Sequence, residues 1–381
     1  MQRYYFDHNA TTPVSAEVLE AMMPLLTEVY GNASSVHTFG QAARKKLDDA
    51  HREVAELLGA RPEEIVFTSG GTEADNLAIF GVAQGGHIVT TAIEHPAVLA
   101  ACARVKSYTA VPVDASGVVD PDAIRRAIRQ DTRLISVMHA NNELGTIQPV
   151  GEIARLAQEA GIAFHSDGVQ AAGKLEIDVK AMGVDLYSIS GHKLYAPKGV
   201  GVLYVRKGTK LQPILYGGRH ERGMRAGTEN VAGAVGLGRA AQWLVDNGAA
   251  ERRRQAELRD QLEHAVLHRI ADTHVNGAGF SRTPNTTNIR FDGIDSDALL
   301  IALDLRGFAV SSGAACSSGA TEPSHVLLAI GLTKLEARSS IRFSLGRAND
   351  AQQVEALAGA LEESVAHLRK IAPGKLAPAY A

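Results

Sequence analysis

A lysine follows a short apolar stretch in the segment 188–193, which reads SISGHK. We interpret this segment as a buried strand that ends in a small polar turn, so that Lys193 lies at the strand's carboxyl end. An amine held in a fixed position can lose its proton and form a Schiff base with a carbonyl compound. Ser190 and His192 beside it could bind a phosphate. Taken alone, Lys193 fits an ordinary surface lysine better.

Two further polar segments follow predicted strands, at 165–170 (HSDGVQ) and 69–72 (SGGT). In the first, a buried carboxylate at Asp167 could keep a pyridinium nitrogen protonated, which makes an aromatic cofactor an electron sink. In the second, glycines before a helical stretch expose backbone N–H groups that suit an anion. Taken alone, Asp167 is also typical of a turn or helix cap. The second segment matches neither a P-loop nor the dinucleotide fingerprint.

A histidine and a cysteine complete the set of side chains that could react. His95 follows a predicted strand, where an imidazole can stack on an aromatic cofactor and transfer protons. It is one of 14 histidines, so taken alone it fits a structural or surface role better. Of the two cysteines, Cys102 fits a thiol buried in an apolar helix. Cys316 lies in the glycine- and serine-rich segment 311–319, where a nucleophile is exposed and mobile.

The composition restricts the class of protein. A chain of 381 residues is long for one core, so two domains are expected. The net charge of -3, from 39 basic and 42 acidic residues, argues against a nucleic-acid surface. No apolar run reaches membrane-spanning length and no signal peptide is visible, which predicts a cytoplasmic protein with reduced cysteines. Without paired cysteine spacing, we expect no metal site.

Strands and helices alternate over the first 205 residues. Buried strands are expected at 65–68, 87–91, 134–138, 162–165, 186–189 and 200–205. Helices are expected between them, at 41–59, 73–82, up to about 105, from 121 onward and at 152–160. Gly59 is a natural helix stop and Asp120 a natural cap. This alternation predicts an α/β fold whose mostly parallel sheet binds ligands beyond the carboxyl ends of its strands.

The pattern changes near residue 230. An alanine-rich and then charged stretch from 232 to about 270 is expected to link two domains. Strands expected at 287–291 and 340–343, with helices around them, predict a smaller α+β domain. The tail at 372–378 is expected to be frayed.

The ordered motifs resemble those of the cysteine desulfurases of the NifS/IscS group, in class V of the fold-type-I pyridoxal-phosphate (PLP) enzymes. The resemblance covers nearly the whole chain. It is carried by eight segments, at 5–13 (YFDHNATTP), 31–37 (GNASSVH), 68–73 (TSGGTE), 141–145 (NNELG), 190–193 (SGHK), 225–230 (RAGTEN), 311–319 (SSGAACSSG) and 342–346 (RFSLG). The segment at 225–230 is more similar to NifS than to IscS. Position 33 is Ala where many relatives carry Pro, and Gly71 is Ala in some.

The resemblance implies a role for each cofactor-binding residue. Lys193 would hold the cofactor as a Schiff base, Asp167 would pair with its pyridine nitrogen and Gln170 with its ring hydroxyl. His95 would stack on the ring and move protons. The phosphate would be held by two turns of one subunit and by a threonine of the other, namely by Gly71, Thr72, Ser190, His192 and the partner subunit's Thr228.

The resemblance also implies the substrate site. Asn142, beside the cofactor, and Arg342 would hold the substrate carboxylate, for which the planar guanidinium is suited. The thiolate of Cys316 would take the sulfur. The segment 311–331 reads as a loop and then a helix with Pro323 near its start, the longer form of this loop.

The implied fold is that of a fold-type-I transferase. A large PLP-binding domain of residues 13–250 would contain a mostly parallel seven-stranded sheet. A smaller α+β domain of residues 251–381, together with 1–12, would carry the cysteine loop. The protein would be a homodimer.

We therefore expect a cysteine desulfurase that converts L-cysteine to L-alanine and leaves the sulfur on Cys316 as a persulfide. An acceptor or iron–sulfur scaffold protein would then receive it, for iron–sulfur assembly, nitrogenase maturation or tRNA thiolation. The nearest alternative is a selenocysteine lyase of the same fold. An aminotransferase would have no use for the thiol loop. A non-enzymatic sulfur carrier or scaffold would need neither Lys193 nor Asp167.

Overall fold

The computed structural model of this chain describes residues 3–312 and 323–371. Its largest sheet has the strand order β2-β8-β7-β6-β5-β3-β4. Within this sheet, β8 is antiparallel to both neighbours and the other six strands are parallel to one another. The seven strands are β2 (Ile65–Thr68), β3 (His87–Thr91), β4 (Tyr108–Val111), β5 (Thr132–Ser136), β6 (Ala163–Asp167), β7 (Leu186–Ser190) and β8 (Gly201–Val205). The predicted mostly parallel, seven-stranded sheet is confirmed.

Helices around this sheet lie close to the predicted residues. They are α2 (Thr38–Leu58), α3 (Gly71–Ala83), α4 (Pro96–Val105), α5 (Pro121–Ala127) and α6 (Val150–Glu159). The short helix α7 (Val179–Met182) was not predicted. Gly59 ends α2 with a φ of 65°, a left-handed conformation that favours glycine. The carboxylate of Asp120 caps α5 by accepting a hydrogen bond from the backbone of Asp122. The sequence analysis did not foresee β4 or the helix α1 (Ala16–Thr27).

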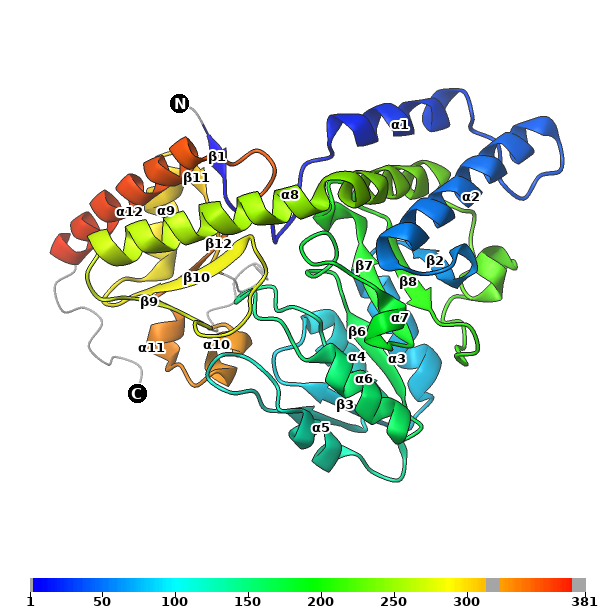
Figure 1. Ribbon diagram of the computed structural model, residues 1–381, viewed down its shortest axis with the longest axis horizontal. Helices are drawn as coiled ribbons and strands as arrows, with labels where there is room; N and C mark the ends of the chain where they lie inside the picture. Colours follow the sequence, from blue (N-terminus) through cyan, green and yellow to red (C-terminus); the bar gives the residue numbers. More distant parts are fainter. Residues whose placement is uncertain (1–2, 313–322, 372–381) are drawn as a thin grey trace.

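A second hydrophobic core lies beside the first. It surrounds a sheet of order β12-β10-β9, with β9 (Thr273–Val275), β10 (Thr286–Phe291) and β12 (Ser340–Ser344). The helices α9 (Ser296–Asp304) and α12 (Ala351–Ile371) pack in this core. The short helices α10 (His325–Ala329) and α11 (Lys334–Ala337) pack in a smaller cluster with Ile93, Met138 and Leu144. β1 (Tyr4–Tyr5) pairs in parallel with β11 (Phe308–Ala309), and Phe6 is buried in this second core. The start of the chain therefore packs with its C-terminal part (Figure 1).

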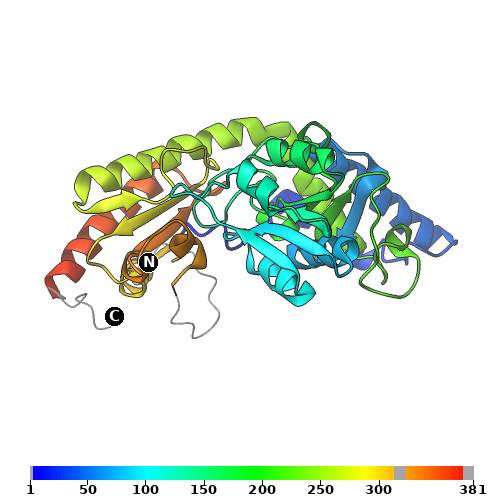
Figure 2. The same cartoon turned by 90° about the horizontal axis from the view of Figure 1, so that it is seen from below.

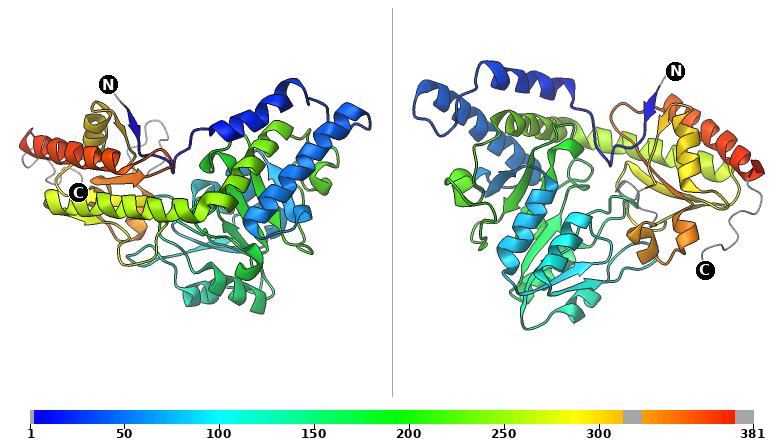
Figure 3. Two further views of the ribbon diagram at one scale, coloured as in Figure 1. Left: turned by 45° about the horizontal axis from the view of Figure 1, so that its top comes forward. Right: turned by 180° about the vertical axis from the view of Figure 1, so that it is seen from behind.

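The stretch that was expected to link two domains is one continuous helix, α8 (Val231–Arg269). Leu237 and Leu244 in its first half belong to the core of the large sheet. Leu258 and Leu262 in its second half belong to the second core. α8 lies along both parts of the molecule (Figure 2), and α1 and α2 stand beside its first half (Figure 3). The domain division near residue 250 stays a prediction from the sequence.

The parallel strands fix where polar side chains can meet. β6 ends at Asp167, and β7 leads directly into a short 3-10 turn, Gly191–Lys193. β2 leads through two residues into α3, and β3 leads toward His95, the cap of α4. These four junctions lie at the same edge of the sheet because the strands share one direction. Within residues 3–312 and 323–371, no helix combines the length and the apolar character that crossing a bilayer requires.

Candidate active site

A cavity of about 460 Å³ lies at the carboxyl edge of the large sheet and reaches Arg342 of the second core. Ten residues predicted from the sequence line it, namely Gly71, Thr72, His95, Asn142, Asp167, Gln170, Ser190, His192, Lys193 and Arg342. Thr228 is exposed on the surface and is not part of this lining. Cys316 lies outside the residues that the structure describes. The structure thus brings together predicted residues that lie up to 271 positions apart in the sequence, from Gly71 to Arg342.

Lys193 occupies the end of the short turn after β7 and is half-buried. Its Nζ atom donates hydrogen bonds to the main-chain oxygens of Asn9 at 2.6 Å and Ala10 at 2.7 Å. Burial lowers the pKa of this amine to about 8, and the nearby Arg342 guanidinium acts in the same direction. With this pKa, a sizeable fraction of the amine is neutral near physiological pH. The neutral amine is the form that attacks a carbonyl group.

Asp167 is the last residue of β6, and its Oδ1 atom accepts a hydrogen bond of 2.9 Å from the backbone of Val169. Burial raises the pKa of this carboxyl group, whereas His95 and Lys193 lower it. A carboxylate buried beside positive groups is suited to hold a protonated ring nitrogen.

Two further carboxyl groups lie near Asp167, and the sequence had given neither a role. Burial and the neighbouring Asp167 raise the pKa of Asp75, on α3, well above its ordinary value. Burial raises the pKa of Glu94 to about 8. Only Asp167 has His95 and Lys193 as compensating neighbours, so we assign the negative charge of this group to Asp167. Asp75 is inside a helix with no local pattern that marks it as functional.

His95 lines the cavity, and one hydrogen bond fixes which of its ring nitrogens carries the proton. Its Nδ1 atom caps α4 by accepting a hydrogen bond of 3.1 Å from the backbone of Ala97. Burial lowers the pKa of this imidazole, so the neutral form is favoured. Because Nδ1 acts as the acceptor, the proton of the neutral ring is on Nε2. This leaves one ring nitrogen available for proton transfer to a ligand.

The other end of the cavity offers donors for an anion. α3 begins after Gly70, whose lack of a side chain leaves the first-turn N–H groups without a side-chain cap. Such N–H groups and the helix dipole attract phosphate. A Cβ atom added at Gly71 would lie 2.8 Å from Cγ2 of Val169, so this backbone is closely packed against the opposite wall. Ser190 and His192 supply further donors.

Arg342 lies on β12 and is only 4% exposed. One guanidinium nitrogen donates to Oδ1 of Asp7 at 2.7 Å and another to the main-chain oxygen of Asn142 at 3.1 Å. Its Nε atom is buried and has no hydrogen-bond partner among residues 3–312 and 323–371. A buried guanidinium group that lines the cavity is suited to a ligand carboxylate.

Asn9 connects these groups, although the sequence analysis gave it no role. Its main-chain oxygen accepts hydrogen bonds from Lys193 and, at 3.0 Å, from Nε2 of Gln170. Its side-chain amide donates to the main-chain oxygen of Asn142 at 3.1 Å and to Thr286 at 2.9 Å. Asn9 was named only within the motif 5–13 of the resemblance, and that membership was its one signal in the sequence.

The residues on either side of the segment 313–322 also reach the site. Ser311 lines the cavity. Ser324 caps α10 and donates a hydrogen bond of 2.6 Å to Oε2 of the buried Glu143. His325 contacts the main-chain oxygen of Glu94 at 3.0 Å through Nε2. The predicted helix near Pro323 is therefore confirmed as α10, and it is tied to the residues beside His95 and Asn142.

The donors and acceptors that line the cavity fit pyridoxal phosphate. The cavity offers an amine of lowered pKa for its aldehyde, a buried carboxylate for its ring nitrogen, and an uncapped helix start with hydroxyl groups for its phosphate. The residues that would hold it are those predicted from the sequence.

Comparison with known proteins gives consistent similarities. Residues 4–357 match the family described as Aminotransferase class-V. Cysteine desulfurase IscS of Dictyoglomus turgidum is 47% identical over 380 residues, which cover 97% of this chain and 96% of that protein. Cysteine desulfurase IscS of Methanosarcina thermophila is 47% identical over 378 residues, covering 97% and 93%. A solved NifS-like protein has a TM-score of 0.90 at 36% identity, covering 96% of this chain and 100% of that one.

Proposed function

Because the chain belongs to the aminotransferase class-V family and is a cysteine desulfurase, a pyridoxal-phosphate enzyme, we propose that the cavity at the sheet edge binds the cofactor and L-cysteine. The observation that supports this assignment most is the position of Lys193. Its buried amine, with a pKa lowered to about 8, lies in the same cavity as Asp167 and the open start of α3.

Pyridoxal phosphate supplies an electron sink that weakens bonds near the amino group of its substrate. Side chains of this protein would bind the cofactor and orient it for this chemistry. Lys193 would bind the cofactor and afterwards hold or return a proton at Nζ. Asp167 would keep the ring nitrogen protonated, and Gln170 would donate a hydrogen bond to the ring hydroxyl. Gly71, Thr72, Ser190 and His192 would hold the phosphate.

The substrate end of the cavity orients L-cysteine. Arg342 and Asn142, which both line the cavity, would hold its carboxylate. Lys193, in the same lining, would then lie on the side of the amino group. His95 moves protons through Nε2, because its Nδ1 atom is occupied by the backbone of Ala97.

Cys316 accepts the sulfur. Its thiolate attacks the substrate sulfur, a new S–S bond forms and the bond from carbon to sulfur breaks, with its electron pair remaining on carbon. Protonation of that carbon gives L-alanine, and Cys316 carries a persulfide. No outside oxidant is needed, because L-cysteine and one thiol become L-alanine and one persulfide. The persulfide is then passed to an acceptor, such as an iron–sulfur scaffold protein, in the cytoplasm.

We also propose that the enzyme is a homodimer. Thr228 is exposed and away from its own chain's cavity, as expected if it completes the phosphate site of a second copy. Large apolar side chains on α1 and after it, each at least 49% exposed, offer a surface for that copy, namely Leu19, Met23, Leu26, Tyr30, Val36 and Phe39. Such a group of exposed apolar residues marks an interaction surface.

The experiment that tests the proposed function measures three products of one reaction mixture. Purified protein loaded with pyridoxal phosphate is mixed with L-cysteine, and L-alanine, protein-bound persulfide and free sulfide are quantified. We expect one persulfide per Cys316 in the first turnover, formed together with one L-alanine. Pyruvate and ammonia in place of L-alanine, or no cofactor absorbance, would contradict the proposal. Parallel assays with L-selenocysteine compare this activity with that of a selenocysteine lyase.

A further inference from the structure

A second buried lysine lies close to Lys193. Lys174, in the turn after β6, is only 8% exposed, and its ammonium group donates a hydrogen bond of 2.7 Å to Oδ1 of Asn9. It also donates to Oε1 of Gln170. Neither partner is a carboxylate, and Lys174 forms no salt bridge within residues 3–312 and 323–371. Burial lowers the pKa of this amine well below its ordinary value.

Packing alone does not explain this lysine. A buried amine loses its hydration, which costs free energy unless its hydrogen bonds compensate. Lys174 also lines a cavity of about 30 Å³ together with His8, Lys193 and Asn285, so the space around it is not fully packed. Burial and the neighbouring Lys174 lower the pKa of the His8 imidazole to about 4, and a histidine carries no negative charge that could compensate an amine. A leucine or methionine would fill the same space at a lower cost of desolvation.

The hydrogen bonds of Lys174 have a geometric consequence. The Nζ atom of Lys174 donates to the side-chain oxygen of each of the two amides that it contacts, those of Asn9 and Gln170. The oxygen of Gln170 therefore faces Lys174, and Nε2 faces the other way, where it donates to the main-chain oxygen of Asn9 at 3.0 Å. The oxygen of Asn9 is fixed in the same manner, and its Nδ2 atom faces Asn142. One buried amine thus holds two side-chain amides by their oxygen atoms.

We propose that Lys174 is a positioning residue that fixes the side-chain amide of Gln170 so that its N–H, and not its oxygen, faces the ring hydroxyl of bound pyridoxal phosphate. This inference rests on the proposed function, in which Gln170 contacts that hydroxyl group. The ring oxygen carries negative charge when its proton is lost. An amide N–H stabilises that charge, whereas an amide oxygen turned toward it would repel it.

Lys174→Met tests the proposal, since methionine has a similar length and no donor. The variant is studied alone and combined with Gln170→Leu, and the cofactor dissociation constant is measured by fluorescence titration. We expect Lys174→Met to weaken cofactor binding about tenfold when Gln170 is present, as loss of one oriented hydrogen bond implies. In the Gln170→Leu background we expect a change of less than about twofold, because the two residues act as one unit.

A spectroscopic readout accompanies the binding data. The pH at which the visible absorbance of the bound cofactor changes is expected to rise by about one unit in Lys174→Met, because the ring oxygen loses a stabilising donor and holds the shared proton more firmly. In the Gln170→Leu background this midpoint is expected to stay nearly constant. Equal shifts in both backgrounds would overturn the proposal, since Lys174 would then act on the cofactor through its charge or on the fold alone.

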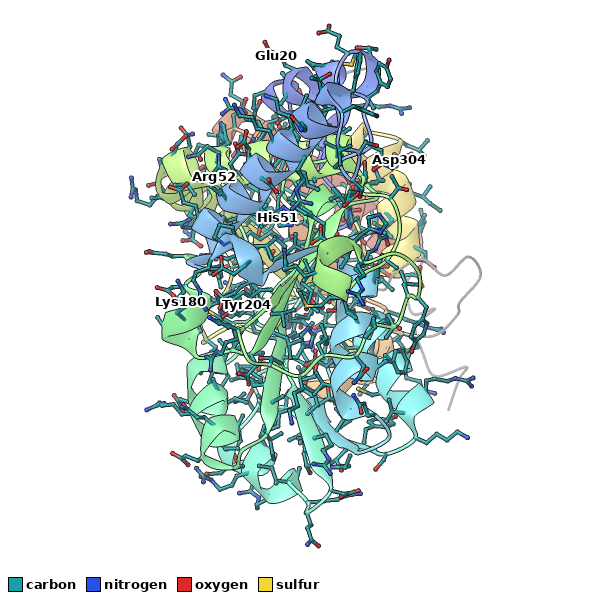
Figure 4. All side chains as sticks on the ribbon, turned by 90° about the vertical axis from the view of Figure 1, so that its right-hand side faces the viewer. Glu20, His51, Arg52, Lys180, Tyr204 and Asp304 are labelled. Carbon is teal, nitrogen blue, oxygen red and sulfur yellow. The ribbon has the colours of Figure 1, made fainter. Side chains whose placement is uncertain are left out.

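Two controls keep the test decisive. Lys180→Met alters an exposed lysine on α7, at the outer edge of the large part (Figure 4), and is expected to change neither measurement. If Lys174→Met does not fold, Lys174→Gln is measured instead, both alone and combined with Gln170→Leu. The same criterion then applies. Failure of the proposed function is distinguishable, because the unmodified chain would then bind no cofactor. Failure of this inference leaves a chain that binds the cofactor but shows no coupling between Lys174 and Gln170.

Discussion

The Nζ atom of Lys193 donates a hydrogen bond of 2.6 Å to the main-chain oxygen of Asn9, a residue 184 positions earlier in the chain. Asn9 is also bound to Asn285 and Thr286 beside the second core, at 3.1 and 2.9 Å. The amine that we assign to the cofactor is therefore held by a segment that contacts both cores. A shift of either core relative to the other would move this amine.

Lys193→Ala is expected to abolish L-alanine formation. Among the described residues that line the cavity, Lys193 is the one lysine, so the visible absorbance of the bound cofactor should also be lost. We expect the rate to fall by more than about 100-fold, since the same amine also transfers protons. Absorbance spectra and L-alanine release are measured side by side. Lys198→Ala, an exposed neighbour, is the control, and activity near the unmodified rate in Lys193→Ala would show that another lysine carries the cofactor.

The sequence predicted the elements that carry the cofactor groups because those elements have strong local patterns. Short apolar segments followed by polar turns placed Asp167 and Lys193 at strand ends, and both lie there. The strand at 134–138 was placed two residues too late, since β5 begins at Thr132. The half-exposed β4, Tyr108–Val111, has no continuous apolar run and was missed for that reason.

Residues that act through tertiary contacts could not be found in this manner. Asp75 lies in the middle of α3, and Lys174 follows a turn in which a lysine is unremarkable. Their burial results from the packing of segments far apart in the chain. The sequence predicted the stretch of the 39-residue helix α8 only as a link between two domains. Its first half packs in one core and its second half in the other, so no single apolar face runs along the whole helix.

Glu94→Gln is expected to make the free energy of unfolding less sensitive to rising pH. Burial raises the pKa of Glu94 from 4.5 to about 8. Between these values the unfolded chain releases the proton while the folded chain keeps it, so the free energy of unfolding decreases as the pH rises. Below about 4.5 the contribution is fully present, and above about 8 it is lost. Glutamine mimics the protonated acid, because one oxygen still accepts from Thr91 and from the backbone of Met138.

Denaturant unfolding of the cofactor-free protein at pH 5 and pH 9 measures this effect. Relative to the unmodified protein, Glu94→Gln should gain on the order of 3 kcal/mol between the two pH values, since each pKa unit corresponds to about 1.4 kcal/mol. A stability difference that is the same at both pH values would contradict a raised pKa at Glu94.

Ser324→Ala is expected to destabilise the fold beyond the loss of a helix cap. Ser324 accepts hydrogen bonds from the backbones of Val326 and Leu327, and it donates to the buried Glu143. Its removal leaves that carboxyl group with one partner fewer, so we expect a loss of about 1–3 kcal/mol in the free energy of unfolding. Thr333→Ala, the cap of α11 on the surface, is the control and should cost less. Equal losses would mean that Glu143 contributes nothing to the effect.

A homodimer is expected in solution, with α1 at the interface. Replacement of Met23 and Leu26 by glutamate places charges on the exposed apolar surface and should yield monomers. Light scattering measures the mass, and L-alanine release measures activity. These monomers should bind the cofactor less tightly, because the partner's Thr228 is then missing from the phosphate site. A fully active monomer would contradict the composite site.

Cys316→Ala separates the persulfide mechanism from other reactions of the same cofactor. Lys193, Asp167 and His95 are unchanged, so the variant should bind pyridoxal phosphate and L-cysteine. The reaction should then stop, because no thiolate takes the sulfur. The sequence predicts an exposed position for Cys316, so the free energy of unfolding should change by no more than about 0.5 kcal/mol.

Cys102→Ala is the matched control for that experiment. Cys102 is buried in α4, and burial raises the pKa of its thiol to about 12, which leaves almost no thiolate at neutral pH. This variant should therefore retain both L-alanine release and protein-bound persulfide, whereas Cys316→Ala should lose both. If Cys316→Ala releases L-alanine from L-cysteine at the unmodified rate, the persulfide mechanism is wrong. A lyase that frees sulfide directly would then account for the same cavity, with Lys193 and Asp167 in their proposed roles and no part for the thiol.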